Sequence, residues 1–140
     1  MKIENLKLKI SRGFTLLEML VVIGIIAVLV AVGTSSYSTA QKKSRDARRK
    51  TDLKTIQNAF EQYYSVCGYS YPAPSGGSVP TSIACANPPA TIMTSVPVDP
   101  KSGTRYTMTQ TTTSDYAICA PNTPPLETEA VTPYCLTNQQ

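Results

Sequence analysis

One carboxylate, that of Glu18, lies inside an apolar run that extends from Phe14 to Gly33. A charged acid at the centre of a membrane-spanning helix costs on the order of 3 kcal/mol, so such a residue is by default a candidate functional site. It needs a positive partner, and the run contains no Lys or Arg. A free α-amino group on a neighbouring chain, exposed by cleavage of the Gly13–Phe14 bond, would supply that charge.

The composition excludes several kinds of catalytic and metal site. The chain has no His, so it cannot form a Ser-His or Cys-His nucleophilic pair or a His-ligated metal centre. Asp99 and Asp115 are two isolated acids, which are too few for a calcium site. We therefore predict a protein that is not an enzyme and that holds no cofactor or metal.

The apolar run has the length of a membrane span. Its twenty residues would form a helix of about 30 Å, the thickness of the hydrocarbon layer of a bilayer. One interpretation is a secretory signal peptide that is cleaved after the small residues near Gly33. A simple membrane anchor also fits the length, and a third interpretation depends on Glu18.

A helical pattern continues beyond the apolar run. No proline occurs before position 72, and apolar side chains recur at intervals of three and four residues, which predicts an amphipathic helix with one face to bury. We expect a single helix from about residue 14 to about residue 66, ending near Gly68. The residues that carry the pattern are Leu53, Ile56, Phe60, Tyr63 and Cys67.

The segment after Gly68 is rich in Pro, Thr and Ser, which favours strands and loops over helix. The runs Arg105–Gln110 and Asp115–Cys119 predict a hairpin, and residues 133–138 are a candidate third strand. Because this segment contains few large aliphatic residues, we expect it to pack on the helix face that carries Ile56 and Phe60.

The four cysteines, Cys67, Cys85, Cys119 and Cys135, all follow the apolar run, and none forms a C-x-x-C pair. An even number of cysteines in a chain with an export-like N-terminus predicts two disulfides in an oxidising compartment. Cys67–Cys85 with Cys119–Cys135 is the most local of the three pairings, and the other two stay open, as do four unpaired buried thiols.

Residues 13–18, G-F-T-L-L-E, follow a short basic leader and open the unbroken apolar run. At these residues the sequence resembles the type IV pilin and pseudopilin family. The resemblance implies that a prepilin peptidase cleaves the Gly13–Phe14 bond, that Phe14 is then N-methylated, and that Glu18 pairs with the N-terminal amine of the adjacent subunit. It also implies an α+β fold, with a long N-terminal helix, its first half transmembrane, packed on a small antiparallel sheet.

The resemblance continues, less sharply, through residues 52–72 and the V-P-V-D-P segment at residues 96–100, which are similar to major pseudopilins and to Gram-positive-type pilins. The chain lacks the W-G-N-P-Y motif of secretion-system major pseudopilins, and four cysteines are atypical of that subgroup. Both differences favour a surface pilus. The Cys119–Cys135 loop is similar to the C-terminal disulfide loop of many pilins.

Seven bases lie between Lys42 and Lys54. We favour a solvated helix face, which could contact anionic lipid or the acidic head of a neighbour, over a nucleic-acid site. The bases that flank the apolar run do not favour a cytoplasmic N-terminus, because more of them lie downstream. We give this count of flanking bases less weight, because cleavage of the leader requires the leader to be cytoplasmic.

These observations predict a leader at residues 1–13, a transmembrane and filament-core helix at 14–33, a soluble helical continuation at 34–67 and a disulfide-bonded, β-rich head at 68–140. We expect a structural subunit of a pilus or pilus-like filament. It would cross the plasma membrane once with its head outside, and it would associate with other pilins after cleavage. The alternatives are a secretion-system pseudopilin and a membrane-anchored binding component that never polymerises.

Overall fold

The computed structural model describes residues 13–120, 126–128 and 133–139. The chain divides into two units, an N-terminal unit of Met1–Ser38 and a head unit of Thr39–Gln140. A single helix, α1 (Leu16–Val66), begins in the first unit and ends in the second. Its bounds agree closely with the helix that the sequence pattern predicts.

Local sequence sets both ends of α1. At its start, the Thr15 hydroxyl accepts a hydrogen bond of 3.2 Å from the backbone N–H of Glu18, as a helix N-cap does. At its end, Gly68 takes a positive φ of 86°, and the Tyr69 N–H donates to the Tyr64 carbonyl oxygen at 3.0 Å. This is the Schellman arrangement, in which glycine adopts a left-handed conformation that other residues rarely take.

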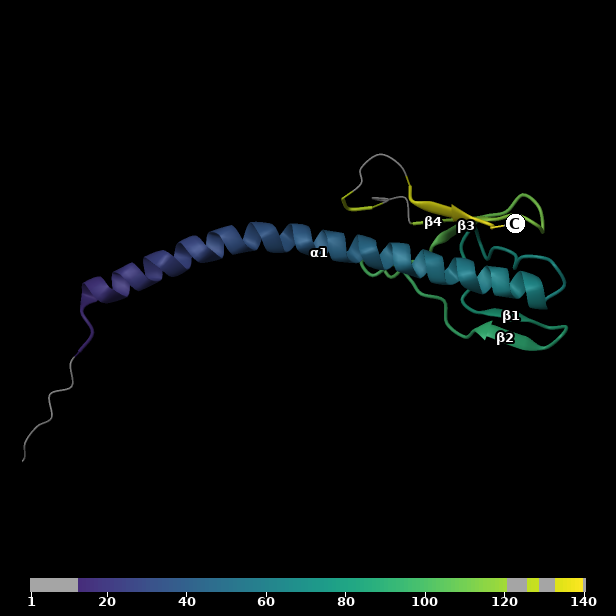
Figure 1. The fold of residues 1–140 in the computed structure, drawn as a ribbon, viewed down its shortest axis with the longest axis horizontal. Coiled ribbons are helices and arrows are strands. Elements are labelled where there is room, and N and C mark those ends of the chain that lie inside the picture. The colour runs from purple at the N-terminus through teal and green to yellow at the C-terminus, as the bar shows by residue number, and fades with distance from the viewer. Residues whose placement is uncertain (1–12, 121–125, 129–132, 140) are drawn as a thin grey trace, which may run out of the picture. The chain divides into compact units, whose positions relative to one another are not determined.

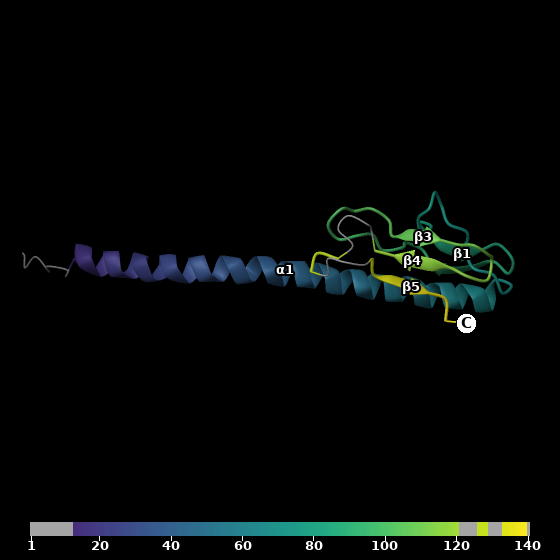
Figure 2. The ribbon, with the colours of Figure 1, turned by 90° about the horizontal axis from the view of Figure 1, so that it is seen from above.

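Two small antiparallel sheets lie beside the C-terminal part of α1 (Figures 1 and 2). One is a hairpin of β1 (Ile83–Cys85) and β2 (Ala90–Met93). The other has the order β3-β4-β5 and consists of β3 (Thr107–Thr109), β4 (Ala117–Cys119) and β5 (Cys135–Thr137). The predicted α+β fold, a long N-terminal helix with small antiparallel sheets, is confirmed.

The hydrophobic core of the head unit lies between α1 and the two sheets. The helix contributes Leu53, Ile56 and Phe60, none of which is exposed. Phe60 meets Tyr116 edge-on, with ring centroids 5.0 Å apart, a favourable aromatic geometry. The buried apolar residues outside the helix are Tyr71, Val79, Ile83, Val96, Tyr106, Met108, Tyr116, Ile118, Ala120 and Leu126.

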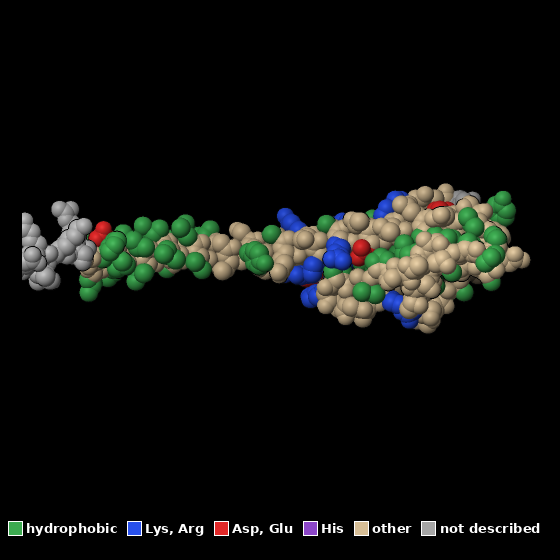
Figure 3. Space-filling model, turned by 90° about the horizontal axis from the view of Figure 1, so that it is seen from below, with side chains coloured by type: hydrophobic (Ala, Val, Ile, Leu, Met, Phe, Trp, Pro, Cys, Tyr) green, Lys and Arg blue, Asp and Glu red, His purple; other side chains and the backbone are tan. Residues whose placement is uncertain are grey.

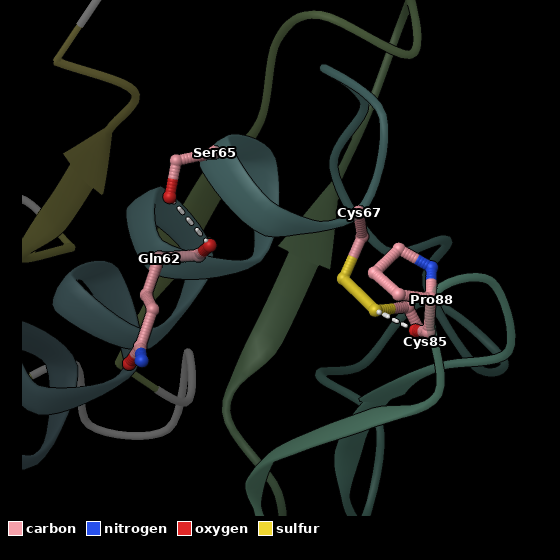
Figure 4. The surroundings of a disulfide bond; sticks show 5 residues. All are labelled: Gln62, Ser65, Cys67, Cys85 and Pro88. Carbon is pink, nitrogen blue, oxygen red and sulfur yellow. Dashed lines mark hydrogen bonds between the residues drawn. A yellow bond between two sulfur atoms is a disulfide. The ribbon is translucent and has the colours of Figure 1, made fainter.

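Two disulfides connect parts of the head unit that are near in sequence. Cys67, just after α1, is bonded to Cys85 at the end of β1 (Figure 4), and Cys119 of β4 is bonded to Cys135 of β5. These are the pairs that sequence order favours. The first joins the end of the helix to the first hairpin, and the second joins two paired strands of the three-stranded sheet.

The β1–β2 hairpin is a feature that the sequence analysis did not predict. Its strands are three and four residues long, and a turn with two prolines separates them. The alternation of apolar and polar side chains is therefore too short to predict a strand. Its position depends on contacts distant in sequence, because Ile83 is buried in the core and Cys85 is bonded to Cys67.

We expect Phe60→Ala to lower the free energy of unfolding of the head unit by about 3–5 kcal/mol, because the substitution leaves a cavity between α1 and the sheets. Urea unfolding of the detergent-solubilised chain, followed by the near-ultraviolet circular dichroism of the tyrosines, would measure it. Asn58→Ala, at an exposed position of the same helix, is the matched control and should change little. A loss below about 1 kcal/mol for Phe60→Ala would contradict the assigned core.

Candidate functional site

The bond between Gly13 and Phe14 lies in the three residues before α1, which have no regular secondary structure. Both residues are exposed, and Phe14 keeps 72% of its surface accessible. A Cβ atom built on Gly13 would meet no other atom within 4 Å. The backbone at this bond is therefore open to an enzyme without prior unwinding of the helix.

Glu18 lies in the first turn of α1 and is exposed. Its backbone N–H is held by Thr15, but its carboxylate has no partner among the described residues. A carboxylate in the first turn interacts favourably with the positive end of the helix dipole. The structure thus places Gly13, Phe14 and Glu18 together at one helix end, with the acid available to a second molecule.

Apolar side chains line the face of the N-terminal stretch of α1 that Figure 3 presents. Large residues from Leu16 to Val32 are between about half and four-fifths exposed. By length and composition, α1 is the helix within the described residues that could cross a membrane. An exposed apolar surface of this extent indicates contact with lipid or with another protein.

Residues 8–34 match a family model described as the prokaryotic N-terminal methylation motif. The chain therefore carries the N-terminal motif of prokaryotic prepilins. Its likeness to the type IV pilins is also found in one curated relative, the type IV major pilin protein PilA of Myxococcus xanthus (strain DK1622). The two are 34% identical over 55 residues, which are 39% of this chain and a quarter of the relative's length. No solved structure matches the chain.

A second constellation, which we call the ion cluster, connects α1 to two loops of the head unit. The Arg49 guanidinium donates to Asp99 at 2.5 Å and to Asp46 at 2.8 Å, and it lies 3.4 Å from Glu127. Arg45 donates to Glu127 with two nitrogens, at 2.7 and 2.6 Å. We use the name for Arg45, Asp46, Arg49, Asp99 and Glu127.

Asp99 anchors its own loop as well as the helix. It accepts the backbone N–H groups of Lys101 and Ser102 at 2.9 and 2.7 Å, in addition to the Arg49 guanidinium. Burial alone would raise the pKa of Asp99, but the hydrogen bonds from Arg49 and the loop outweigh it and hold this pKa well below its usual value. Among the described residues no group of acids is arranged to hold a metal ion, and Asp99 uses its oxygens on a guanidinium.

Glu127 and Asp46 fix the second loop. The pKa of Glu127 is lowered to about 2, chiefly by its hydrogen bond from Arg45. Asp46 accepts the backbone N–H groups of residues 127 and 128, each at 2.9 Å. Burial opposes the ionisation of Asp46, yet these hydrogen bonds lower its pKa overall.

The expectation that the basic run from Lys42 to Lys54 forms a solvated helix face is wrong for its middle. Asp46 and Arg49 are 4% and 2% exposed, because the two loops fold over this turn of α1. The sequence did contain a signal for this, since Arg49 precedes Leu53 by four residues and therefore lies on the buried face of the helix. Its two distant acidic partners, Asp99 and Glu127, lie 50 and 78 residues further along the chain and had no such signal.

Tyrosine hydroxyls from the head unit bind two further carboxylates of α1. Tyr106 donates to Asp52 at 2.8 Å, and Tyr71 and Tyr116 each donate to Glu61 at 2.9 Å. Burial, reinforced by the neighbouring carboxylate, raises the pKa of all three tyrosines. Tyr71 is buried, whereas Tyr69, two residues before it, is exposed.

We expect Arg49→Met to destabilise the head unit by about 3–5 kcal/mol, because it leaves buried carboxylates without their counter-charge. Arg48→Met is the matched control, since Arg48 is exposed and makes no ion pair within the described residues. Urea unfolding of both variants would measure the difference. Equal, small effects would contradict a structural role for the cluster.

We expect the stability of the head unit to fall as the pH is lowered from about 5 to about 2. The pKa values of Asp46, Asp99 and Glu127 are lowered in the folded protein, so the unfolded chain binds more protons in this range and acid favours it. Urea midpoints at a series of pH values would test this. Glu127→Gln should flatten the dependence, and an unchanged slope in that variant would count against the assignment.

Proposed function

We propose that this chain is a structural subunit of a type IV pilus-like filament, held in a membrane before assembly by the apolar stretch from Phe14 to Gly33. The observation that carries the proposal is the capped helix start, where the Glu18 carboxylate, which has no partner among the described residues, lies beside an exposed bond at Gly13–Phe14. The methylation motif matched at residues 8–34 supports it.

In this proposal a prepilin peptidase removes residues 1–13, and the new amine at Phe14 is methylated. Residues 14–33 then cross the plasma membrane and later enter the filament core, residues 34–67 continue the helix, and residues 68–140 form the exported head. Copies of this chain or other pilins are the assembly partners. The role is structural and not enzymatic.

Assembly exchanges one environment for another at the same apolar surface. In the membrane, lipid covers the side chains that are exposed in the N-terminal unit, and in a filament the helices of neighbouring subunits would cover them. Glu18 would be costly in either environment without a counter-charge. The amine of a neighbouring Phe14 would provide that charge in a low-dielectric setting, where it is worth far more than in water.

We expect Glu18→Gln to abolish filaments while leaving processing and folding intact. The change removes the charge that would bind a neighbour's amine but keeps the size of the side chain. Electron microscopy of cells that express each variant as the sole copy would count filaments. Intact-mass analysis should give a chain that starts at methylated Phe14 with both disulfides formed. Glu18→Asp, which keeps a carboxylate, is the matched control and should retain filaments.

Wild-type numbers of filaments in Glu18→Gln would show that this residue does not determine assembly. Absence of filaments in the parent strain, with the processed chain present in the membrane, would favour the non-polymerising anchor. Loss of protein secretion without loss of surface filaments would favour the pseudopilin. A mature chain that starts near Thr34 would indicate an ordinary signal peptide.

A further inference from the structure

The acids of the head unit are all engaged within the fold, as far as the structure describes them. Each accepts at least one hydrogen bond from a side chain or a backbone N–H of the same unit. The described surface of the head therefore offers no unengaged carboxylate to a basic partner. These acids are Asp46, Asp52, Glu61, Asp99, Asp115 and Glu127.

Of the exposed basic residues that have no partner among the described residues, Lys42 and Lys43 lie nearest to the apolar stretch. Both are exposed and make no hydrogen bond or ion pair with a described residue. They are the first charged residues after Glu18, since residues 34–41 are all uncharged. Figure 3 shows Lys and Arg side chains on both edges of α1 next to the rest of the head unit.

The spacing along α1 suits contact with lipid headgroups. Nine helical residues from Gly33 to Lys42 correspond to roughly 13 Å, and the headgroup layer extends about 5–7 Å beyond the hydrocarbon on each side. Helical lysines point back toward the N-terminus and extend their ammonium groups toward an interface. The side chain of Lys42 can therefore span the remaining distance between its backbone and the headgroup layer.

Tyr37 gives a second, independent indication of an interface. It lies four residues after Gly33, and 68% of its surface is exposed. Tyrosine is enriched at the depth of the headgroups, because its ring is apolar and its hydroxyl is polar. The order from Gly33 through Tyr37 to Lys42 is thus apolar, then amphipathic, then cationic, as at the edge of a bilayer.

The directions of the two lysines favour lipid over nucleic acid. Neighbouring residues of an α-helix diverge by about 100° around its axis, so the ammonium groups of Lys42 and Lys43 extend on different sides of α1. A lipid layer surrounds a membrane-spanning helix and meets both. A nucleic-acid duplex approaches from one side and would contact a stripe of basic side chains along one face of the helix.

We propose that Lys42 and Lys43 bind the phosphates of anionic lipid headgroups on the head side of the membrane that α1 enters. The proposal rests on the membrane anchoring proposed above and is independent of filament assembly. A lysine near an anionic membrane surface is worth about a fivefold gain in binding. The pair would hold the subunit at a defined depth and give it a preference for anionic over zwitterionic lipid.

The test uses the full chain in nanodiscs that contain equal amounts of phosphatidylcholine and phosphatidylglycerol. Native mass spectrometry of the released protein counts the lipids of each kind that stay bound. We expect several-fold enrichment of phosphatidylglycerol in the wild type, and the ratio of the disc itself in the double variant K42Q/K43Q. R48Q is the matched control, because Arg48 is also exposed but lies six residues further along the helix.

Co-purification with the discs shows whether the chain is anchored, which separates failure of this proposal from failure of the membrane assignment. Both disulfides should be intact in every variant, as non-reducing peptide mapping would show. Enrichment that survives in K42Q/K43Q, or that R48Q reduces equally, overturns the proposal. The proposal is also overturned if the wild type shows no enrichment of phosphatidylglycerol and binds duplex DNA in a way that K42Q/K43Q abolishes. That result would assign the lysines to nucleic acid.

Discussion

Leu53, Ile56 and Phe60 of α1 supply the part of the hydrophobic core that the rest of the head unit cannot provide. The strands are three or four residues long, and each sheet alone would bury too little apolar surface to be stable in water. Both sheets therefore depend on one face of the helix. It follows that the helix is a layer of the domain, and that its C-terminal half cannot separate from the sheets without unfolding them.

Polar contacts determine where along α1 the sheets sit. Apolar packing alone would tolerate a shift of one helical turn, because similar side chains recur every three or four residues. Asp46, Asp52 and Glu61 prevent such a shift, since each accepts hydrogen bonds from a different segment of the head. Arg49 adds a fourth connection through Asp99. At Asp46 and Asp99, which are buried, loss of these contacts would leave a carboxylate unsatisfied, which costs more than the contacts themselves contribute.

Regular spacing made part of this architecture predictable from sequence. The helix, its end at Gly68, the buried positions from Leu53 to Phe60 and the β3–β4 hairpin all follow from local patterns. The β1–β2 hairpin and the ion cluster do not, because each depends on residues far apart in the chain. Arg49 illustrates the limit of such patterns. Its position on the apolar face of the helix can be read from the sequence, but its pairing with Asp99 and Glu127 cannot. At the N-terminus the methylation motif could be recognised from the sequence alone, because the residues that define it are consecutive.

The hydrogen bond from the Glu18 N–H to the Thr15 hydroxyl lies entirely on the C-terminal side of the Gly13–Phe14 bond. A helix whose cap came from the leader would lose its first turn when the leader was removed, since the freed N–H groups would have no acceptor. Under the cleavage proposed above, the cap would stay with the shortened chain. The start of the helix therefore contains its own cap, which does not depend on a side chain before Phe14.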